Sequence, residues 1–212
     1  MKRALRRARA RARGYTFIEL LMSMMILTIG VTGVIAMQKV TVTSNQHAKN
    51  LAMATQIAQS WLGQLQADAI AWNHPSARNP NSDLGDTHWL SNVSLMNRTW
   101  LRPAWVSSRN FGPTFDAQGK PIEPDDANQV QFCTHIRLSW LFQPGAASGA
   151  VVTGNGLMRA EVRVFWLRDG MAGVEKKPVC SADVATLVGA AENRSRYHFV
   201  YATSAVRENT AL

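Results

Sequence analysis

The chain of 212 residues lacks proline throughout its first 74 residues, and the first of its eight prolines is Pro75. It also lacks charge over much of that stretch, because Glu19 is the only charged residue between Gly14 and Lys39. Proline breaks helices and charge is costly inside a bilayer, so these two absences permit one long helix whose first part lies in a membrane. A lone carboxylate in that run is unexpected for a simple anchor.

Acidic residues are absent from residues 1–14, which carry seven of the chain's 23 Lys and Arg residues. The rest of the chain has 16 of these bases against 14 acids, so the formal net charge of +9 belongs mainly to the N-terminus. This distribution argues against nucleic acid as a partner, although Arg159, Arg163 and Arg168 could form a basic stripe. A basic block beside an apolar run is more often a topology signal that stays in the cytoplasm.

Cysteine is scarce, since only Cys133 and Cys180 are present. Two cysteines do not complete a structural zinc site without histidines. The histidines show no ligand spacing and are interpreted as surface or turn residues; they are His47, His74, His88, His135 and His198. If the C-terminal part lies outside the cytoplasm, one Cys133–Cys180 disulfide is the simpler interpretation.

Motifs of catalysis are missing as well. The chain has no glycine-rich phosphate loop and no nucleophile motif, so we expect a protein that is not an enzyme and needs no cofactor or metal. The acidic turn around Asp125 offers oxygen ligands of the kind that calcium prefers, but its spacing is not that of an EF-hand. Glycosylation acceptor patterns at Asn92, Asn97 and Asn193 are short enough to arise by chance.

One long apolar run is present, from Phe17 to Met37. At ~1.5 Å per residue, a helix of this length reaches about 30 Å, which is enough to cross a bilayer core. A cleaved secretory signal has a shorter apolar region of ~7–15 residues. The sequence therefore predicts a hydrophobic transmembrane or assembly helix over residues 15–44, with residues 1–14 in the cytoplasm and the remainder outside.

The helix is expected to continue to about residue 72 as the start of a globular head that spans residues 45–212. Apolar residues recur there at steps near three and four, which is typical of an amphipathic helix with one buried stripe. The predicted stripe consists of Leu51, Ala54, Ala58, Trp61, Leu65 and Trp72. The polar residues interpreted as lying outside it are Gln56, Gln59, Gln64, Gln66 and Asp68.

Residues 73–128 are rich in Pro, Asn, Asp, Ser and Gly, which predicts a connector with short elements, held to the core by tryptophans at 89, 100 and 105. Residues 129–212 hold segments in which apolar and polar residues alternate, for example Phe132 to Phe142. This period of two predicts an antiparallel sheet that is covered on one face. The expected fold class is α+β, with the long N-terminal helix packed on the C-terminal sheet.

The stretch "RGYTFIELLMSMMILTIG", residues 13–30, resembles the type III signal of type IV prepilins and pseudopilins. The resemblance implies that a membrane aspartyl prepilin peptidase cuts between Gly14 and Tyr15 and N-methylates Tyr15. It also places Glu19 at the fifth residue of the mature chain, where it would act in assembly. The stretches "ILTIGVTGVIAMQ" and "LAMATQIAQSWLGQL" are similar to the minor pilins of the PilV group, the type IV pilus modification proteins.

This resemblance implies a minor pilin that helps to initiate assembly of a type IV pilus and sits at or near its tip, with roles in adhesion and twitching. Expected partners are other minor pilins, the major pilin, a large tip adhesin and the inner-membrane assembly platform. The head would lie in the periplasm before assembly and on the cell surface afterwards. A type II secretion pseudopilin shares every N-terminal feature, and a membrane-anchored periplasmic binding or sensor module would keep residues 1–14.

Overall fold

The computed structural model describes residues 14–73, 83–96, 99–123, 129–143, 156–168, 180 and 196–209. The chain divides into two compact units that meet between Ala48 and Lys49. Helix α1 (Phe17–Asp68) contributes to both units, whereas every strand belongs to the second, which we call the head.

Helix α1 has 52 residues and is continuous through Gly30 and Gly33. The chain leaves open space around both glycines, so nothing in its own packing requires them. The predicted helix is confirmed, but it ends at Asp68 and not at about residue 72. Beyond Asp68 the chain forms tight turns with bonds between residues three apart, such as Trp72 N to Ala69 O at 3.1 Å.

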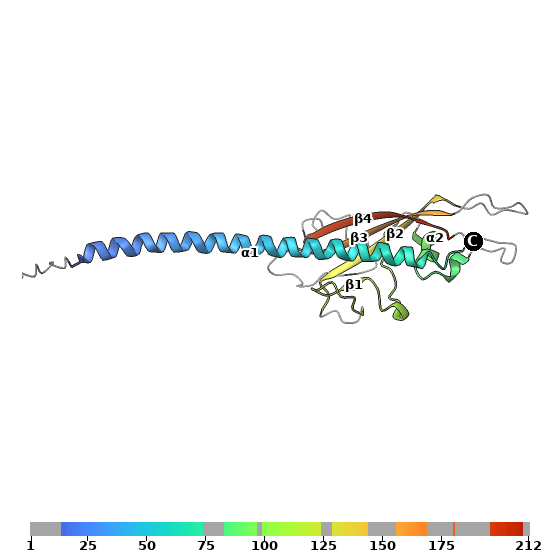
Figure 1. Cartoon of the computed structure of the whole chain (residues 1–212), viewed down its shortest axis with the longest axis horizontal. Coiled ribbons are helices and arrows are strands. Elements are labelled where there is room, and N and C mark those ends of the chain that lie inside the picture. Colours follow the sequence, from blue (N-terminus) through green and yellow to red (C-terminus); the bar gives the residue numbers. More distant parts are fainter. Residues whose placement is uncertain are drawn as a thin grey trace, which may run out of the picture. The chain divides into compact units, whose positions relative to one another are not determined.

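Four antiparallel strands form the sheet, in the order β1-β2-β3-β4 (Figure 1). They are β1 (Thr114–Phe115), β2 (Phe132–Phe142), β3 (Leu157–Leu167) and β4 (Tyr197–Arg207). The predicted α+β layout, a helix on an antiparallel sheet, is confirmed. One difference is that β1 comes from the segment interpreted as a connector.

The connector is built from short helical turns, as its composition predicts. They are η1 (Asp83–Asp86), η2 (Leu90–Asn92), α2 (Val93–Met96) and η3 (Ser107–Arg109). Ahead of Lys120 the chain makes a turn in which Gly119 N donates to Asp116 O at 3.1 Å. Gly119 has a φ of 75°, which few residues other than glycine adopt readily.

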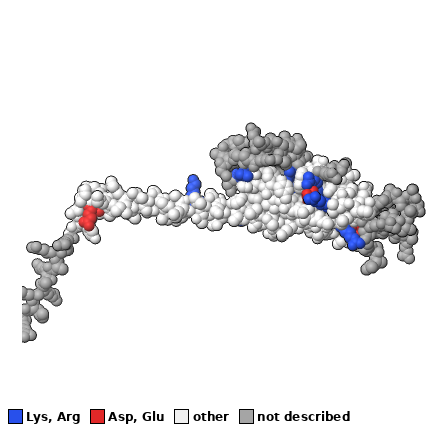
Figure 2. Space-filling model, turned by 90° about the horizontal axis from the view of Figure 1, so that it is seen from above, with Lys and Arg blue, Asp and Glu red and all other residues white. Residues whose placement is uncertain are grey.

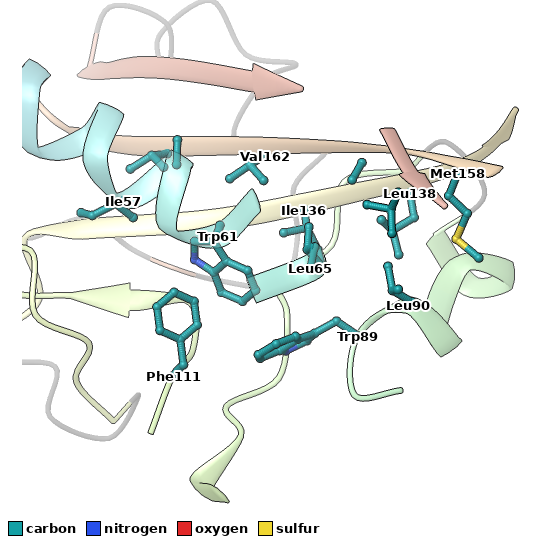
Figure 3. Close-up of a cluster of buried hydrophobic side chains, with 14 of the residues drawn as sticks. Ile57, Trp61, Leu65, Trp89, Leu90, Phe111, Ile136, Leu138, Met158 and Val162 are labelled. Atoms are coloured by element: carbon teal, nitrogen blue, oxygen red, sulfur yellow. The ribbon is translucent and has the colours of Figure 1, made fainter. Parts of the chain in front are cut away.

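The core lies between the head part of α1 and one face of the sheet (Figure 3). Cross-strand neighbours such as Ile136, Val162 and Ala202 share this face, because residues directly opposite each other on paired strands point to the same side. The helix contributes Ala54, Ile57, Ala58, Trp61 and Leu65.

Trp61 lies at the centre of an aromatic cluster. Its ring meets Trp89 edge-on at 5.2 Å and Phe111 at 4.8 Å between centroids (Figure 3). Trp89 therefore anchors the connector in the core, as expected. Two details of the predicted stripe are wrong: Leu51 is 44% exposed, and Asp68, interpreted as a polar residue outside the stripe, is fully buried.

The face of the sheet opposite α1 is also partly covered, which differs from the prediction of one covered face. A second buried cluster lies there at one end of the strands, formed by Val130, Cys133, Phe165 and Tyr197. Tyr197, Phe199 and Tyr201 share a side as expected, and that side faces away from the helix, with Tyr201 left 58% exposed.

Candidate assembly site

The N-terminal turn of α1 holds Glu19 in a fixed place. The Thr16 carbonyl accepts hydrogen bonds from Glu19 N at 3.1 Å and from Leu20 N at 3.2 Å, so the helix begins directly after Tyr15 and Thr16. Glu19 is the acidic residue of this first turn. A carboxylate there is favoured by the partial positive charge of the helix N-terminus.

The first half of α1 exposes an apolar surface on all sides. Every described residue from Gly14 to Lys49 is exposed, and Figure 2 shows this stretch as a nearly uncharged surface. By length and composition α1 can cross a membrane, with a mean hydropathy of 2.2 in its most apolar window. An apolar surface this large marks contact with lipid or with other proteins.

Hydroxyl groups within the apolar stretch are satisfied by the helix itself. Ser23 Oγ donates to Leu20 O at 2.8 Å, Thr28 Oγ1 to Met25 O at 2.8 Å, and Thr32 Oγ1 to Ile29 O at 2.9 Å. Such bonds lower the cost of placing these residues in an apolar environment. The Glu19 carboxylate differs, because among the described residues it has no hydrogen bond or ion pair.

Asp68 holds the end of α1 to the connector, a role that the sequence pattern did not predict. Its carboxylate accepts hydrogen bonds from the backbone N–H groups of His88 (3.0 Å), Trp89 (2.8 Å) and Leu90 (3.2 Å), and it forms an ion pair with Arg109 at 3.3 Å. It thus ties the end of α1 to the connector. The signal was present in the sequence, because position 68 continues the spacing of the buried stripe three residues after Leu65.

The outer face of the sheet carries a cluster of charged and aromatic side chains. Arg137 binds Glu161 through two bonds of 2.6 and 2.8 Å, which raise the pKa of Arg137, and Arg159 reaches the same carboxylate at 3.1 Å. Trp100 packs under the guanidinium groups of Arg137 at 4.7 Å and Arg163 at 4.8 Å. Trp100 therefore attaches the connector to this outer face. Figure 2 shows basic and acidic atoms side by side on the head.

Two expectations about this face are wrong. Arg163 is 1% exposed, and burial lowers its pKa, so it does not form a basic stripe with Arg159 and Arg168. His135, interpreted as a surface or turn residue, is buried with its Nδ1 2.8 Å from the Arg163 guanidinium. The strand order buries it, because Arg163 lies opposite His135 on β3.

Cys133 and Cys180 form a disulfide, which fits the sequence-based pairing. Cys133 is fully buried in the second cluster, since Phe165 and Tyr197 pack beside it on the outer face. The described part of the chain contains no group of three or more side chains arranged to hold a metal ion. His74, Asp125 and the acceptor patterns at Asn97 and Asn193 lie outside the described residues.

Gly14 and Tyr15 are exposed ahead of α1. The family model of the prokaryotic N-terminal methylation motif matches residues 9–35, a span that includes both residues and Glu19. No curated protein and no solved structure matches the chain.

The motif suggests a structural, non-enzymatic protein that assembles with other pilins and is processed by the prepilin peptidase. Together with the apolar helix, it fits membrane anchoring followed by incorporation into a pilus. The chain thus carries the prepilin-type methylation motif, which supports a place among the type IV pilin-like proteins, pseudopilins included.

Proposed function

We propose that this chain is a minor pilin that helps to initiate assembly of a type IV pilus and sits at or near the pilus tip. The observation that carries the proposal is the methylation motif on a helix whose first half is exposed throughout and packs against none of the described residues. Such a surface needs lipid around it before assembly and neighbouring helices afterwards. The partners are other minor pilins, the major pilin, a tip adhesin and the inner-membrane assembly platform.

A starting role is supported by features that distinguish this chain from a bulk subunit. The helix is unbroken by proline from Phe17 to Asp68, and its sequence is similar to that of PilV-group minor pilins. The connector of the head consists largely of short irregular elements. The chain without residues 1–14 has little excess charge. These features suit a subunit present in one or a few copies.

Glu19 would serve as a register element. Cleavage after Gly14 creates a positively charged amine at Tyr15, and in a filament the amine of a neighbouring subunit can pair with Glu19. In a water-free bundle of helices the pair is strengthened and an unpaired carboxylate is costly. Subunits would therefore dock at one axial offset.

Processing is the first test. Mass spectrometry of the membrane-extracted chain is expected to show a protein that begins with N-methyl-Tyr15, because the exposed Gly14 ahead of the helix is accessible to the peptidase. A strain without prepilin peptidase provides the control and should retain residues 1–14. An intact chain in a strain with active peptidase would overturn the pilin proposal in favour of a membrane-anchored sensor or binding module.

Deletion of the gene tests the function itself. We expect far fewer surface pili and little change in their bulk composition, because an initiating subunit limits the number of filaments and not their content. Pili counted by electron microscopy, with complementation by the intact gene, provide the measurement. Normal pilus number together with defective protein secretion would point to a type II secretion pseudopilin.

A further inference from the structure

Among the described residues, one edge of the sheet pairs with no further strand, and we call it the open edge. At the opposite edge, β2 is flanked by β1 and by a bridge in which Leu101 and Ile136 exchange two bonds of 2.9 Å. β4 is the last strand of the sheet (Figure 1), and it pairs with β3 over its whole length without a bulge. Its outer side therefore presents a long, regular line of backbone groups.

The hydrogen bonds at the two ends of β4 show which residues point outward. Arg168 N donates to Arg196 O, and Glu208 N donates to Gly156 O, both at 2.9 Å. Antiparallel strands alternate between bonded and non-bonded pairs, so even-numbered residues of β4 bond to β3 and odd-numbered residues face the open edge. The outward residues are Phe199, Tyr201, Thr203 and Ala205.

The outward N–H and C=O groups of these four residues have no backbone hydrogen-bond partner among the described residues. The Ala205 carbonyl alone has a side-chain contact, with Ser204 Oγ at 3.4 Å. Natural edge strands are usually protected by charge, proline, a bulge or short length. β4 has eleven residues, and from Tyr197 to Val206 it contains no Lys, Arg, Asp, Glu or Pro. The stretch from Tyr197 to Val206 lacks every one of these protections, so it is suited to strand pairing.

We propose that the open edge of β4 receives an extended strand from the head of a different pilin-like subunit in the same assembly, with an acidic residue opposite Ala205. This inference rests on the proposed function. The outer face supplies the charge preference, since Arg137 and Arg159 share the carboxylate of Glu161 there. Arg159 is half exposed and lies directly across from the small side chain of Ala205, so it can approach the added strand.

Size and direction argue against a free-standing homodimer. The outward stretch from Phe199 to Ala205 is only about 24 Å long, and a strand of that length buries less than the ~1,000 Å² of a stable isolated complex. The occupant must therefore be held nearby by a second attachment, such as a shared membrane or filament.

Two copies paired antiparallel through β4 would also face opposite ways. The head part of α1 runs in the same direction as β4, because Gln66 meets Ser204 and Asn73 meets Asn209 (Figure 1). A two-fold axis between paired β4 strands reverses this direction in one copy. The two Lys49 ends would then point to opposite sides, whereas chains anchored in one membrane need them on the same side.

Photo-crosslinking of the full chain in its native membranes tests the edge. A benzophenone amino acid at Ala205 is expected to form an adduct with an extended segment of another subunit that carries the methylation motif, located by peptide mass spectrometry. Thr203→Pro removes one outward N–H while leaving the backbone bonds to β3, and should lower the adduct yield about tenfold. The matched Thr203→Val keeps the N–H and should retain the yield; both variants lose the bond from Thr203 Oγ1 to Ala160 O.

The other outcomes separate the two proposals. Three results would overturn the edge docking and leave the minor-pilin proposal standing. They are an unchanged yield in Thr203→Pro, an adduct only with a second copy, and no adduct from a chain that is cleaved after Gly14. An uncleaved chain without an adduct would overturn both, and an uncleaved chain crosslinked to an unrelated protein would show that the occupant is wrong. Arg159→Glu should reduce the yield several-fold, and an unchanged yield would contradict the acidic residue.

Discussion

Replacing Asp68 by alanine is expected to destabilise the head by about 3–5 kcal/mol, because a buried carboxylate with a charged partner and several donors is lost. The change leaves the N–H groups of Trp89 and Leu90 buried without the acceptor they now have, and it removes the carboxylate that pairs with Arg109. A domain is usually stable by only 5–15 kcal/mol, so the loss is a large fraction of the total. Urea unfolding of the full chain in detergent, followed by tryptophan fluorescence, measures it.

Asp116→Ala is the matched control. Asp116 Oδ1 also accepts two backbone bonds, from Gln118 N and Lys120 N at 2.9 Å, but it does so on a turn at the surface. Water can replace that carboxylate, so the expected cost is about 1 kcal/mol. Equal, small effects of the two substitutions would show that Asp68 does not hold the connector to the helix.

Replacing Glu19 by glutamine is expected to reduce recruitment into the assembly at least about tenfold, which corresponds to losing one charge-assisted bond of about 1.5–3 kcal/mol. Glutamine preserves the shape of the side chain and removes its charge. Membrane insertion, cleavage after Gly14 and the fold of the head should be normal, because no described contact of the head involves Glu19. Pull-down of partner minor pilins from crosslinked membranes measures recruitment.

Ser23→Ala controls for a general effect on the helix. Ser23 lies one turn further along α1, and its hydroxyl is satisfied by Leu20 O, so its loss should leave recruitment unchanged. Wild-type recovery of partners by Glu19→Gln would mean that the carboxylate is not the docking element. It would then be an interfacial residue that reaches the headgroups.

The periodicity of the sequence predicted much of the core of the head, and it failed where burial depends on distant residues. The steps of three and four placed Ala54, Ala58, Trp61 and Leu65 in the core correctly. The same spacing includes Asp68, but an aspartate in a buried stripe is credible only when its partners are known. Those partners, at residues 88–90 and Arg109, are 20 or more residues away in an irregular segment.

The outer face of the sheet shows a second case in which the sequence pattern did not predict burial. Alternation assigned Cys133 and His135 to the polar side of β2, and both are buried. Their burial depends on which strands become neighbours: Phe165 lies opposite Cys133, with Phe199 on the far side of Phe165, and Arg163 lies opposite His135. The alternation within β2 does not show which side chains of β3 come to lie opposite it, so no local pattern reports the contact.

The sequence by itself determined α1, its apolar first half and the motif around Glu19, because each of these depends on consecutive residues and on the absence of proline and charge among them. It also determined that the C-terminal part forms strands, since alternation is a local property. Only the tertiary structure decided that Asp68 joins α1 to the connector and that Phe199, Tyr201, Thr203 and Ala205 present their backbone at an open edge. Strand order and hydrogen-bond phase arise from pairing between distant segments, and these pairings exist only once the chain has folded.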